Sequence, residues 1–243
     1  MSNKVRVDGI PVTKAGQLVE IESDVQMADV EIGFVSRGGL KLDYALREFN
    51  VVVNGVICMD VGVSTGGFTD CLLKHGADRV YAIDVGYGQI AWSIRNDKRV
   101  IIFERTNIRE FSREKIVEPI HLAVIDVSFI SLTKVIPNVL KFMTKGEELK
   151  LQSETGMTGI KHDEKFMTKG GQILALIKPQ FEVGKGSVGK GGIIRDEQKR
   201  MSVVEGIRDF FVKIGIDVIG ICQSPITGQK GNVEYFIYGK LKD

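Results

Sequence analysis

One stretch of the chain, residues 56–71, constrains the fold more than any other. It reads VICMDVGVSTGGFTDC, an apolar run that ends in Asp60 and a glycine-rich bend. Residues 56–61 are typical of a buried parallel strand, residues 62–67 of a tight turn that a ligand can approach, and residues 68–76 of the next helix. A strand, a glycine turn and a helix N-terminus in this order predict a nucleotide-type cofactor site.

Two classes of ligand use such a turn, and the glycine spacing distinguishes them. A dinucleotide site has the pattern G-x-G-x-x-G, with amides free to hold a pyrophosphate, but Ser64 stands here where the second glycine would be. A site for S-adenosylmethionine (AdoMet) places acids at the ends of the first two strands for the ribose hydroxyls, and Asp60 and Asp84 fit. The alternative is that both acids only cap turns.

The composition is that of a globular protein with one main domain and a small appendage. The chain has 243 residues, 43% of them hydrophobic, and a net charge of +2, so it can bury a substantial core. No apolar run approaches the roughly 18 residues of a bilayer span, and the first residues lack the apolar centre of a signal peptide. We therefore expect a cytoplasmic protein.

The three cysteines and three histidines give no sign of a disulfide framework or a metal site. The cysteines are odd in number and lack C-x-x-C spacing, and the histidines are scattered. We expect reduced thiols that pack in the core, and no bound metal.

Strands and helices alternate along most of the chain. Helices are expected from about residue 41 to 49, at 90–96, and from Asp196, as the cap, to 214. Further strands are expected at residues 79–84, 100–103, 121–126, 172–178, 217–222 and 233–238. This alternation predicts an α/β fold with a mostly parallel, doubly wound, seven-stranded sheet of the Rossmann type.

Residues 1–30 have a different pattern. Apolar residues alternate at 5–12 and again at 18–21, which predicts two or three short strands that turn at Asp8-Gly9 and Ala15-Gly16.

One short segment occurs twice in the chain: the sequence KFMTKG at residues 141–146 recurs at 165–170. Because two copies do not make a repeat architecture, residues 141–164 are interpreted as an inserted surface loop.

Charged residues at the ends of several predicted strands are expected at one edge of the sheet. Lys178 ends an apolar strand at the carboxyl edge, where open α/β sheets bind ligands. Asp126 ends another strand at the same edge, Glu234 enters the last strand, and Lys41 lies at the start of the first helix. These four side chains are candidates to converge, although Lys178 has the alternative of extending into solvent.

Residues 184–192, GKGSVGKGG, imitate a phosphate-binding P-loop. Gly191 replaces the Ser or Thr that would hold magnesium, so a nucleotide hydrolase is excluded. A basic loop that continues into Arg195 suits the phosphate backbone of a nucleic acid better. A solvated loop without function is the alternative.

Eight segments of the chain together resemble the TlyA family, also called haemolysin A. They are SRGGLKL (36–42), DVGVSTGGFTDC (60–71), DVGYGQ (84–89), ERTN (104–107), IDVSFIS (125–131), KPQFE (178–182), GKGG (189–192) and GNVEY (231–235). The resemblance covers nearly all of residues 5–243. The family is similar to the FtsJ-type AdoMet-dependent RNA ribose 2′-O-methyltransferases, and its members act on cytidine in ribosomal RNA.

The resemblance implies a Rossmann-like class I methyltransferase and a role for each group of site residues. The catalytic tetrad would be Lys41, Asp126, Lys178 and Glu234, with Lys178 as the base that removes the ribose proton. The AdoMet site would consist of Asp60, Gly62, Ser64, Thr65, Gly66, Gly67, Phe68, Asp84, Asn107 and Asp126. Contacts to ribosomal RNA, free or in a subunit, would come from Arg37, Lys185, Lys190 and Arg195.

The chain departs from the family at its start. Family members begin with a complete S4 RNA-binding domain, whereas residues 4–26 resemble only the last strands of one. We therefore expect a partial S4-like element at residues 1–30 and a methyltransferase domain at residues 31–243.

Three other functions compete with this interpretation. A membrane-active haemolysin would need an apolar span, a signal peptide or an amphipathic basic helix, and the sequence has none. A catalytically silent RNA-binding protein on the same scaffold would fail a methyl-transfer assay. A nicotinamide dehydrogenase would need the G-x-G-x-x-G spacing.

Overall fold

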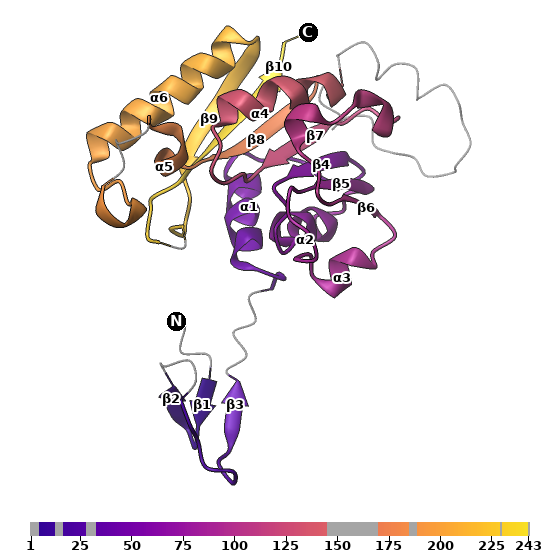
Figure 1. Ribbon diagram of the computed structural model, residues 1–243. Coiled ribbons are helices and arrows are strands. Elements are labelled where there is room, and N and C mark those ends of the chain that lie inside the picture. Colours follow the sequence, from indigo (N-terminus) through magenta and orange to yellow (C-terminus); the bar gives the residue numbers. More distant parts are fainter. Residues whose placement is uncertain are drawn as a thin grey trace. The chain divides into compact units, whose positions relative to one another are not determined.

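The chain consists of two compact units, Met1–Gly33 and Phe34–Asp243 (Figure 1). The computed structural model describes residues 5–12, 17–27, 33–144, 170–184, 189–228 and 230–242. The expected turn at Ala15-Gly16 and most of the expected insertion at 141–164 lie outside these residues. No helix in the described parts has both the length and the apolar character that a bilayer crossing requires.

The first unit contains a small antiparallel sheet with the strand order β2-β1-β3. Its strands are β1 (Val5–Val7), β2 (Ile10–Val12) and β3 (Val25–Met27). Asp8 and Gly9 join β1 to β2 with φ angles of 51° and 79°. Two successive positive φ angles are typical of a tight hairpin turn, as expected from the sequence.

The third strand does not lie where the apolar alternation predicts it. Residues 18–21 belong to no strand, and the side chains of Leu18 and Ile21 are almost fully exposed. Asp8 is instead paired with Asp24: the Asp8 amide donates to the Asp24 carbonyl, and the Asp24 amide donates to the Asp8 carboxylate, both at 2.9 Å. These bonds place the next residues, Val25–Met27, beside β1.

The second unit is built on a seven-stranded sheet with the order β6-β5-β4-β7-β8-β10-β9. The first five strands are parallel, and β10 runs antiparallel to both of its neighbours. The strands are β4 (Ile57–Val61), β5 (Arg79–Ile83), β6 (Val100–Phe103), β7 (Leu122–Ile125), β8 (Gln172–Ile177), β9 (Ile216–Gln223) and β10 (Tyr235–Leu241). The predicted α/β fold is therefore confirmed.

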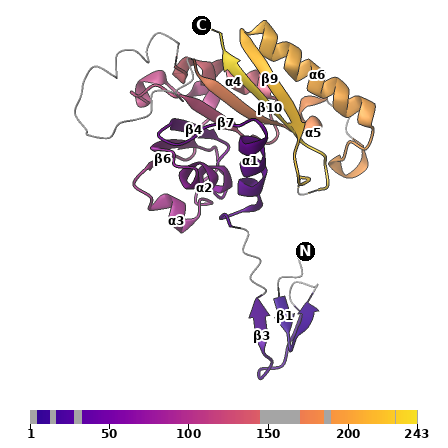
Figure 2. The same cartoon turned by 180° about the vertical axis from the view of Figure 1, so that it is seen from behind.

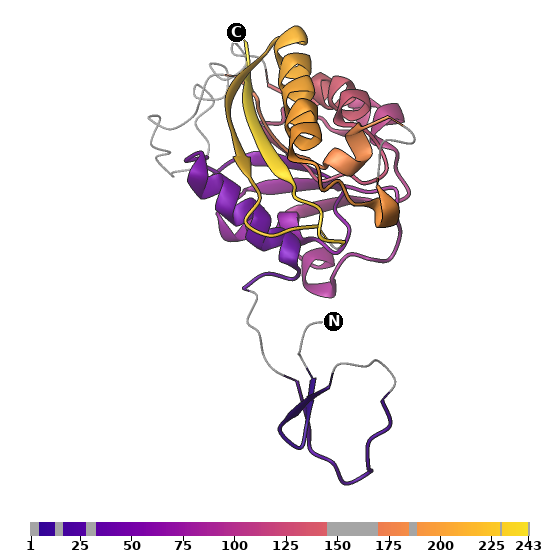
Figure 3. The same ribbon diagram turned by 90° about the vertical axis from the view of Figure 1, so that its left-hand side faces the viewer.

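Helices cover both faces of this sheet (Figures 2 and 3). One face carries α1 (Arg37–Glu48), α2 (Gly67–Lys74) and α3 (Trp92–Arg95), and the other carries α4 (Leu132–Val139), α5 (Pro179–Glu182) and α6 (Glu197–Lys213). Successive residues of β4 alternate between two cores: Cys58 belongs to the core that includes α1 and α2, whereas Met59 belongs to the core that includes α4 and α6. Burial on both faces explains why the central strands of this sheet are continuous apolar runs in the sequence.

The chain changes direction across the sheet between β4 and β7. From β4 it proceeds outward through β5 and β6, and β7 then returns to the other side of β4. A reversal of this kind opens a crevice at the carboxyl ends of the two central strands. Gly62, after β4, and Asp126, after β7, therefore lie where an open α/β sheet binds its ligand.

Helices α1 and α2 approach each other closely near their N-termini. A Cβ atom on Gly67 would lie 2.2 Å from the Ser36 hydroxyl and 2.9 Å from the Gly39 backbone nitrogen. Only glycine fits this contact. The packing places α1, and with it Lys41, next to the helix that follows the central turn.

Candidate active site

The central glycine turn packs against the end of β7. Gly62 has a φ of +92°, and a Cβ atom there would lie 2.4 Å from the Asp126 carbonyl oxygen. A side chain at this position would therefore be both strained and blocked. Glycine brings the ends of the two central strands together.

Asp84, directly after β5, is held by the same turn. One carboxylate oxygen accepts a hydrogen bond from the Ser64 amide at 2.7 Å, and the other accepts one from the Gly86 amide at 2.6 Å. Ser64 adopts a φ of +51°, which is unusual for a residue other than glycine. Each carboxylate oxygen retains a further lone pair, so Asp84 can still accept two hydroxyl groups.

A pocket of about 370 Å³ lies at this edge of the sheet. It has the size of a small-molecule site. Its lining joins the ends of β4, β5 and β7 to the loop after β6. The residues expected in the cofactor site that line it are Gly62, Ser64, Asp84, Asn107 and Asp126.

The other residues expected in the cofactor site do not line the pocket. Thr65, Gly66 and Gly67 form the turn and the start of α2, and Phe68 packs in the core against Phe236. Asp60 is completely buried, and one of its oxygens accepts a hydrogen bond from the Thr69 hydroxyl at 2.6 Å.

Burial gives Asp60 an unusual proton affinity. Removal from water raises the pKa of Asp60 from 3.8 to about 7, the charges of Asp126 and Asp84 add to this, and the Thr69 hydrogen bond opposes it only in part. Its other oxygen has no hydrogen-bond partner among the described residues. Asp60 is thus a buried acid beneath the turn.

Lys178 and Asp126 form an ion pair at the rim of the pocket. The Lys178 Nζ atom lies 2.7 Å from Asp126 Oδ1 and 3.0 Å from the Ser128 hydroxyl. Both charged side chains are mostly buried. Because Asp126 lines the pocket, the pair places an amine beside it.

Lys41 and Glu234 form a second ion pair, with Lys41 Nζ 2.6 Å from Glu234 Oε2. Both side chains are almost fully buried. Gln180 lies two residues after Lys178 and donates from Nε2 to Glu234 Oε1 at 3.4 Å. The structure thus brings the four expected tetrad residues together as two ion pairs, and Gln180 connects their segments.

The sequence alone did not single out Ser128 or Gln180. Both lie inside motifs that were recognised, IDVSFIS and KPQFE, and both are directly beside a charged residue of the tetrad in space. Their position within these motifs was the available signal.

Of the four residues expected to bind RNA, two are described with their side chains. The Arg37 guanidinium donates to the Thr227 carbonyl at 2.9 Å, and Arg195 is exposed. The backbone of Lys190 belongs to the short 3-10 helix Lys190–Gly192, but its side chain is not among those described. Lys185 lies outside the described residues.

The basic loop is attached to the turn that carries Glu234. The buried side chain of Asn232 accepts from the Ile194 amide at 3.0 Å and donates to the Gly192 carbonyl at 2.9 Å. These two hydrogen bonds attach the basic loop to Asn232, which precedes Glu234 by two positions.

Known proteins resemble this chain over most of its length. The sequence model of the FtsJ-like methyltransferase family matches residues 34–241. The 16S/23S rRNA (cytidine-2′-O)-methyltransferase TlyA of Mycobacterium tuberculosis is 41% identical over 98% of this chain and 80% of its own length. Hemolysin A of Brachyspira hyodysenteriae is 38% identical over 96% of this chain and 88% of its own length.

A solved structure agrees with these relatives. A Streptococcus thermophilus protein described as a hemolysin is 36% identical, superposes with a TM-score of 0.79, and is matched over 100% of this chain and 80% of its own. The resemblance to the TlyA family expected from the sequence is confirmed. The chain belongs to the FtsJ-like methyltransferase family.

Proposed function

We propose that this protein transfers the methyl group of AdoMet to the 2′-hydroxyl of a cytidine in ribosomal RNA. The relative from Mycobacterium tuberculosis carries this activity in its name and is 41% identical to the chain over 238 aligned residues. The observation that carries the proposal is the Lys178–Asp126 ion pair, because it places an amine at the rim of the pocket.

The pocket suits AdoMet better than a dinucleotide. Its glycine turn lacks the G-x-G-x-x-G spacing that holds a pyrophosphate, and the Asp84 carboxylate, directly after β5, lines the pocket. Asp84 would accept the two ribose hydroxyls, and Gly62, Ser64 and Asn107 would surround the adenosine. When bound, AdoMet supplies an electrophilic methyl group.

Lys178 would act as the general base. A ribose hydroxyl is a weak nucleophile, so its proton must leave as the oxygen attacks. In its neutral form Lys178 takes that proton on Nζ, while Asp126 and Ser128 fix the direction of the amine. The Lys41–Glu234 pair and Gln180 would hold the neighbouring segments in place.

The RNA would bind over the same edge of the sheet. Arg37 at the start of α1 and Arg195 in the basic loop flank the Glu234 turn and suit phosphate contacts. The partial S4-like element at residues 1–30 would add further contacts.

The proposal is tested by incubation of the protein with tritiated AdoMet and, separately, with naked ribosomal RNA, small subunits and large subunits. We expect tritium in RNA, mapped to the ribose of a cytidine, with wild-type protein and none with Lys178→Ala. Label on a base instead of a ribose, or no label on any substrate, would contradict it. A parallel erythrocyte assay separates the haemolysin alternative, since lysis by Lys178→Ala would be independent of methyl transfer.

A further inference from the structure

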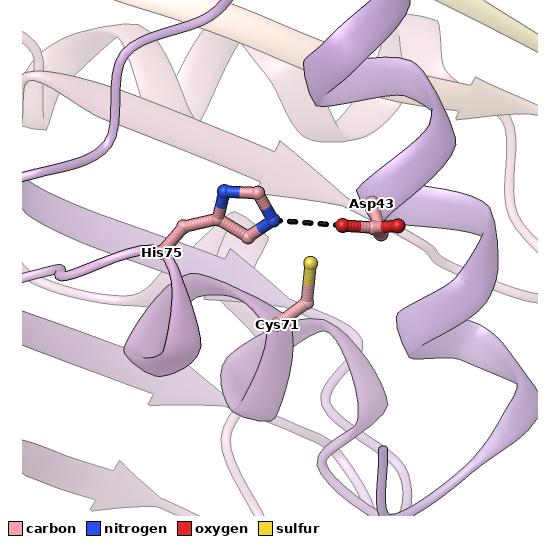
Figure 4. A group of neighbouring side chains, drawn as sticks. All are labelled: Asp43, Cys71 and His75. Carbon is pink, nitrogen blue, oxygen red and sulfur yellow. Dashed lines mark hydrogen bonds and ion pairs between the residues drawn. The ribbon is translucent and has the colours of Figure 1, made fainter. Parts of the chain in front are cut away.

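A second cluster of reactive side chains lies outside the pocket, between α1 and α2 (Figure 4). Asp43 extends from α1, and Cys71 and His75 extend toward it from α2 and its C-terminal cap. One carboxylate oxygen, one imidazole nitrogen and the thiol sulfur lie within 4.8 Å of one another. The His75 Nε2 atom is 2.8 Å from Asp43 Oδ1.

The fold brings these residues together for simple geometric reasons. Cys71 and His75 are four positions apart, so they lie on one side of the same helix, one turn apart. The close contact at Gly67 presses that side against α1. Asp43 lies two positions after Lys41 on α1, at the level of Cys71 and His75.

The chemistry of the three groups matches one class of ligand. Thiolate, imidazole and carboxylate are the side chains that bind Zn²⁺, and three protein ligands with a water in the fourth position are a common arrangement. The three ligand atoms lie within 4.8 Å of one another, and ligands about 2.0–2.3 Å from a tetrahedral Zn²⁺ ion lie roughly 3.3–3.8 Å apart, so the side chains must move closer together on binding. Cys71 is buried, whereas the His75 side chain is 32% exposed, which leaves a path for an ion and room for a water.

A charged neighbour completes the arrangement. Arg47, one turn after Asp43 on α1, pairs with Asp43 Oδ2 and so leaves Oδ1 directed at His75. A partner that holds the second oxygen of a carboxylate ligand is a usual feature of metal sites. The ion pair therefore orients the carboxylate for the cluster.

We propose that Asp43, Cys71 and His75 bind one Zn²⁺ ion, with water as the fourth ligand. Binding replaces the hydrogen bond between His75 Nε2 and Asp43 Oδ1 with zinc bonds to both atoms, and the neutral imidazole then carries its proton on Nδ1. A zinc–sulfur bond forms at Cys71 and the thiol proton is released to solvent, with no change of oxidation state. The ion ties α1 to α2 and so fixes the helix that carries Lys41. The proposal is independent of the methyl acceptor.

The test uses the untagged, reduced full-length chain after removal of metal with a chelator and desalting. Calorimetric titration with Zn²⁺ should show one equivalent bound, and Co²⁺ should give the near-ultraviolet charge-transfer band of a cobalt–thiolate bond. Cys71→Ser should abolish that band. His75→Ala and Cys71→Ser should each weaken Zn²⁺ binding more than roughly tenfold, the lower limit seen for partners that only support a ligand.

Cys222→Ser is the matched control, because Cys222 lies outside the cluster, and it should bind Zn²⁺ as wild type does. If Cys71→Ser folds poorly by circular dichroism, His75→Gln carries the test, because the side chain of residue 75 is partly exposed. Wild-type protein that takes up no stoichiometric Zn²⁺, or uptake unaffected by the His75 and Cys71 variants, would overturn the site.

Discussion

At the scale of single residues, Asp84 shows how a side chain is prepared for a ligand. The Ser64 and Gly86 amides fix both of its carboxylate oxygens beside the pocket. A group held in this way has little freedom to lose when further donors bind. Its contribution to binding is therefore expected to be large.

We predict that Asp84→Ala weakens AdoMet binding strongly, because a charge-assisted hydrogen bond contributes about 1.5–3 kcal/mol, roughly 10- to 150-fold in affinity. Asp84→Asn, which keeps one oxygen, should weaken it less. Calorimetry measures both. Asp78→Ala is the control, since Asp78 is exposed at the opposite end of the same strand. Equal affinity of Asp84→Ala and wild type would place the ribose contact elsewhere.

Lys178 is predicted to act on turnover and not on cofactor affinity. Loss of a general base costs about 10²–10⁴ in rate, so Lys178→Ala should lower kcat by that amount while AdoMet binds almost normally. Lys178→Arg should fail similarly, because a guanidinium stays protonated. The control is Lys98→Ala, an exposed lysine at the other edge of the sheet. Near-normal methylation by Lys178→Ala would exclude Lys178 as the base.

Asp60 is predicted to make stability depend on pH. Because its pKa is raised from 3.8 to about 7 in the folded chain, the folded state keeps a proton there that the unfolded state loses, so stability falls as pH rises from 3.8 to about 7. Asp60→Asn removes this contribution and preserves an acceptor for Thr69. Urea denaturation at about pH 5 and about pH 8 measures the free energy of unfolding. This free energy should fall less between the two pH values in Asp60→Asn than in wild type, and an equal fall in both proteins would contradict the assignment.

At the scale of helices and strands, the sequence predicted the parallel strands best. All seven runs in the second unit form strands, with ends shifted by at most a few residues. The clearest are β7 and β8, which are buried throughout, because a strand buried on both faces must be apolar throughout. The helices were less visible. The one expected at 90–96 is confined to Trp92–Arg95, and α4 and α5 were not expected at all. Such short helices depend on packing more than on local preference.

The candidate site residues differ in the same way: those at strand ends were predicted, and the cluster that depends on helix packing was not. Asp84, Asp126 and Lys178 were found because each ends a parallel strand, and such ends meet at one edge. The cluster of Asp43, Cys71 and His75 was not found, since it depends on how two helices are placed against each other. The packing of α1 on α2 is set by Gly67, far from Asp43 in the sequence.

We predict that Gly67→Ala destabilises the second unit by about 1–3 kcal/mol, the usual cost of an extra methyl group in a tight contact. Its new Cβ would meet Ser36 and Gly39. Gly206→Ala on α6 is the matched control, because a Cβ there meets nothing within 4 Å and should stabilise the helix slightly. Denaturant midpoints decide, and a Gly67→Ala midpoint at or above that of wild type would show that the helices can separate without cost.

At the scale of the whole molecule, the division at residues 33 and 34 gives each unit its own task in our proposal. In its described residues the first unit has three short strands and several exposed apolar side chains, whereas the second unit contains the two cores and the pocket. We therefore predict that a chain starting at Phe34 folds and binds AdoMet as the full chain does.

The shortened chain should nevertheless bind ribosomal RNA more weakly, with a smaller salt dependence, since fewer phosphate contacts remain. Filter binding over a series of salt concentrations compares the two chains. Equal affinity and slope would show that the second unit selects its RNA alone. Loss of AdoMet binding would show that the two units depend on each other.

The position of β10 has a consequence for synthesis. β10 follows β8 and β9 in the chain but lies between them in the sheet, and Glu234 directly precedes it. On a translating ribosome, β8 and β9 therefore emerge before β10, and the edges of β8 and β9 that pair with β10 stay unpaired until it inserts. The same insertion delivers Glu234 to Lys41. An emerging chain therefore lacks the Lys41–Glu234 ion pair until the sheet closes, so the last of the proposed site residues reaches its position only when the sheet is complete.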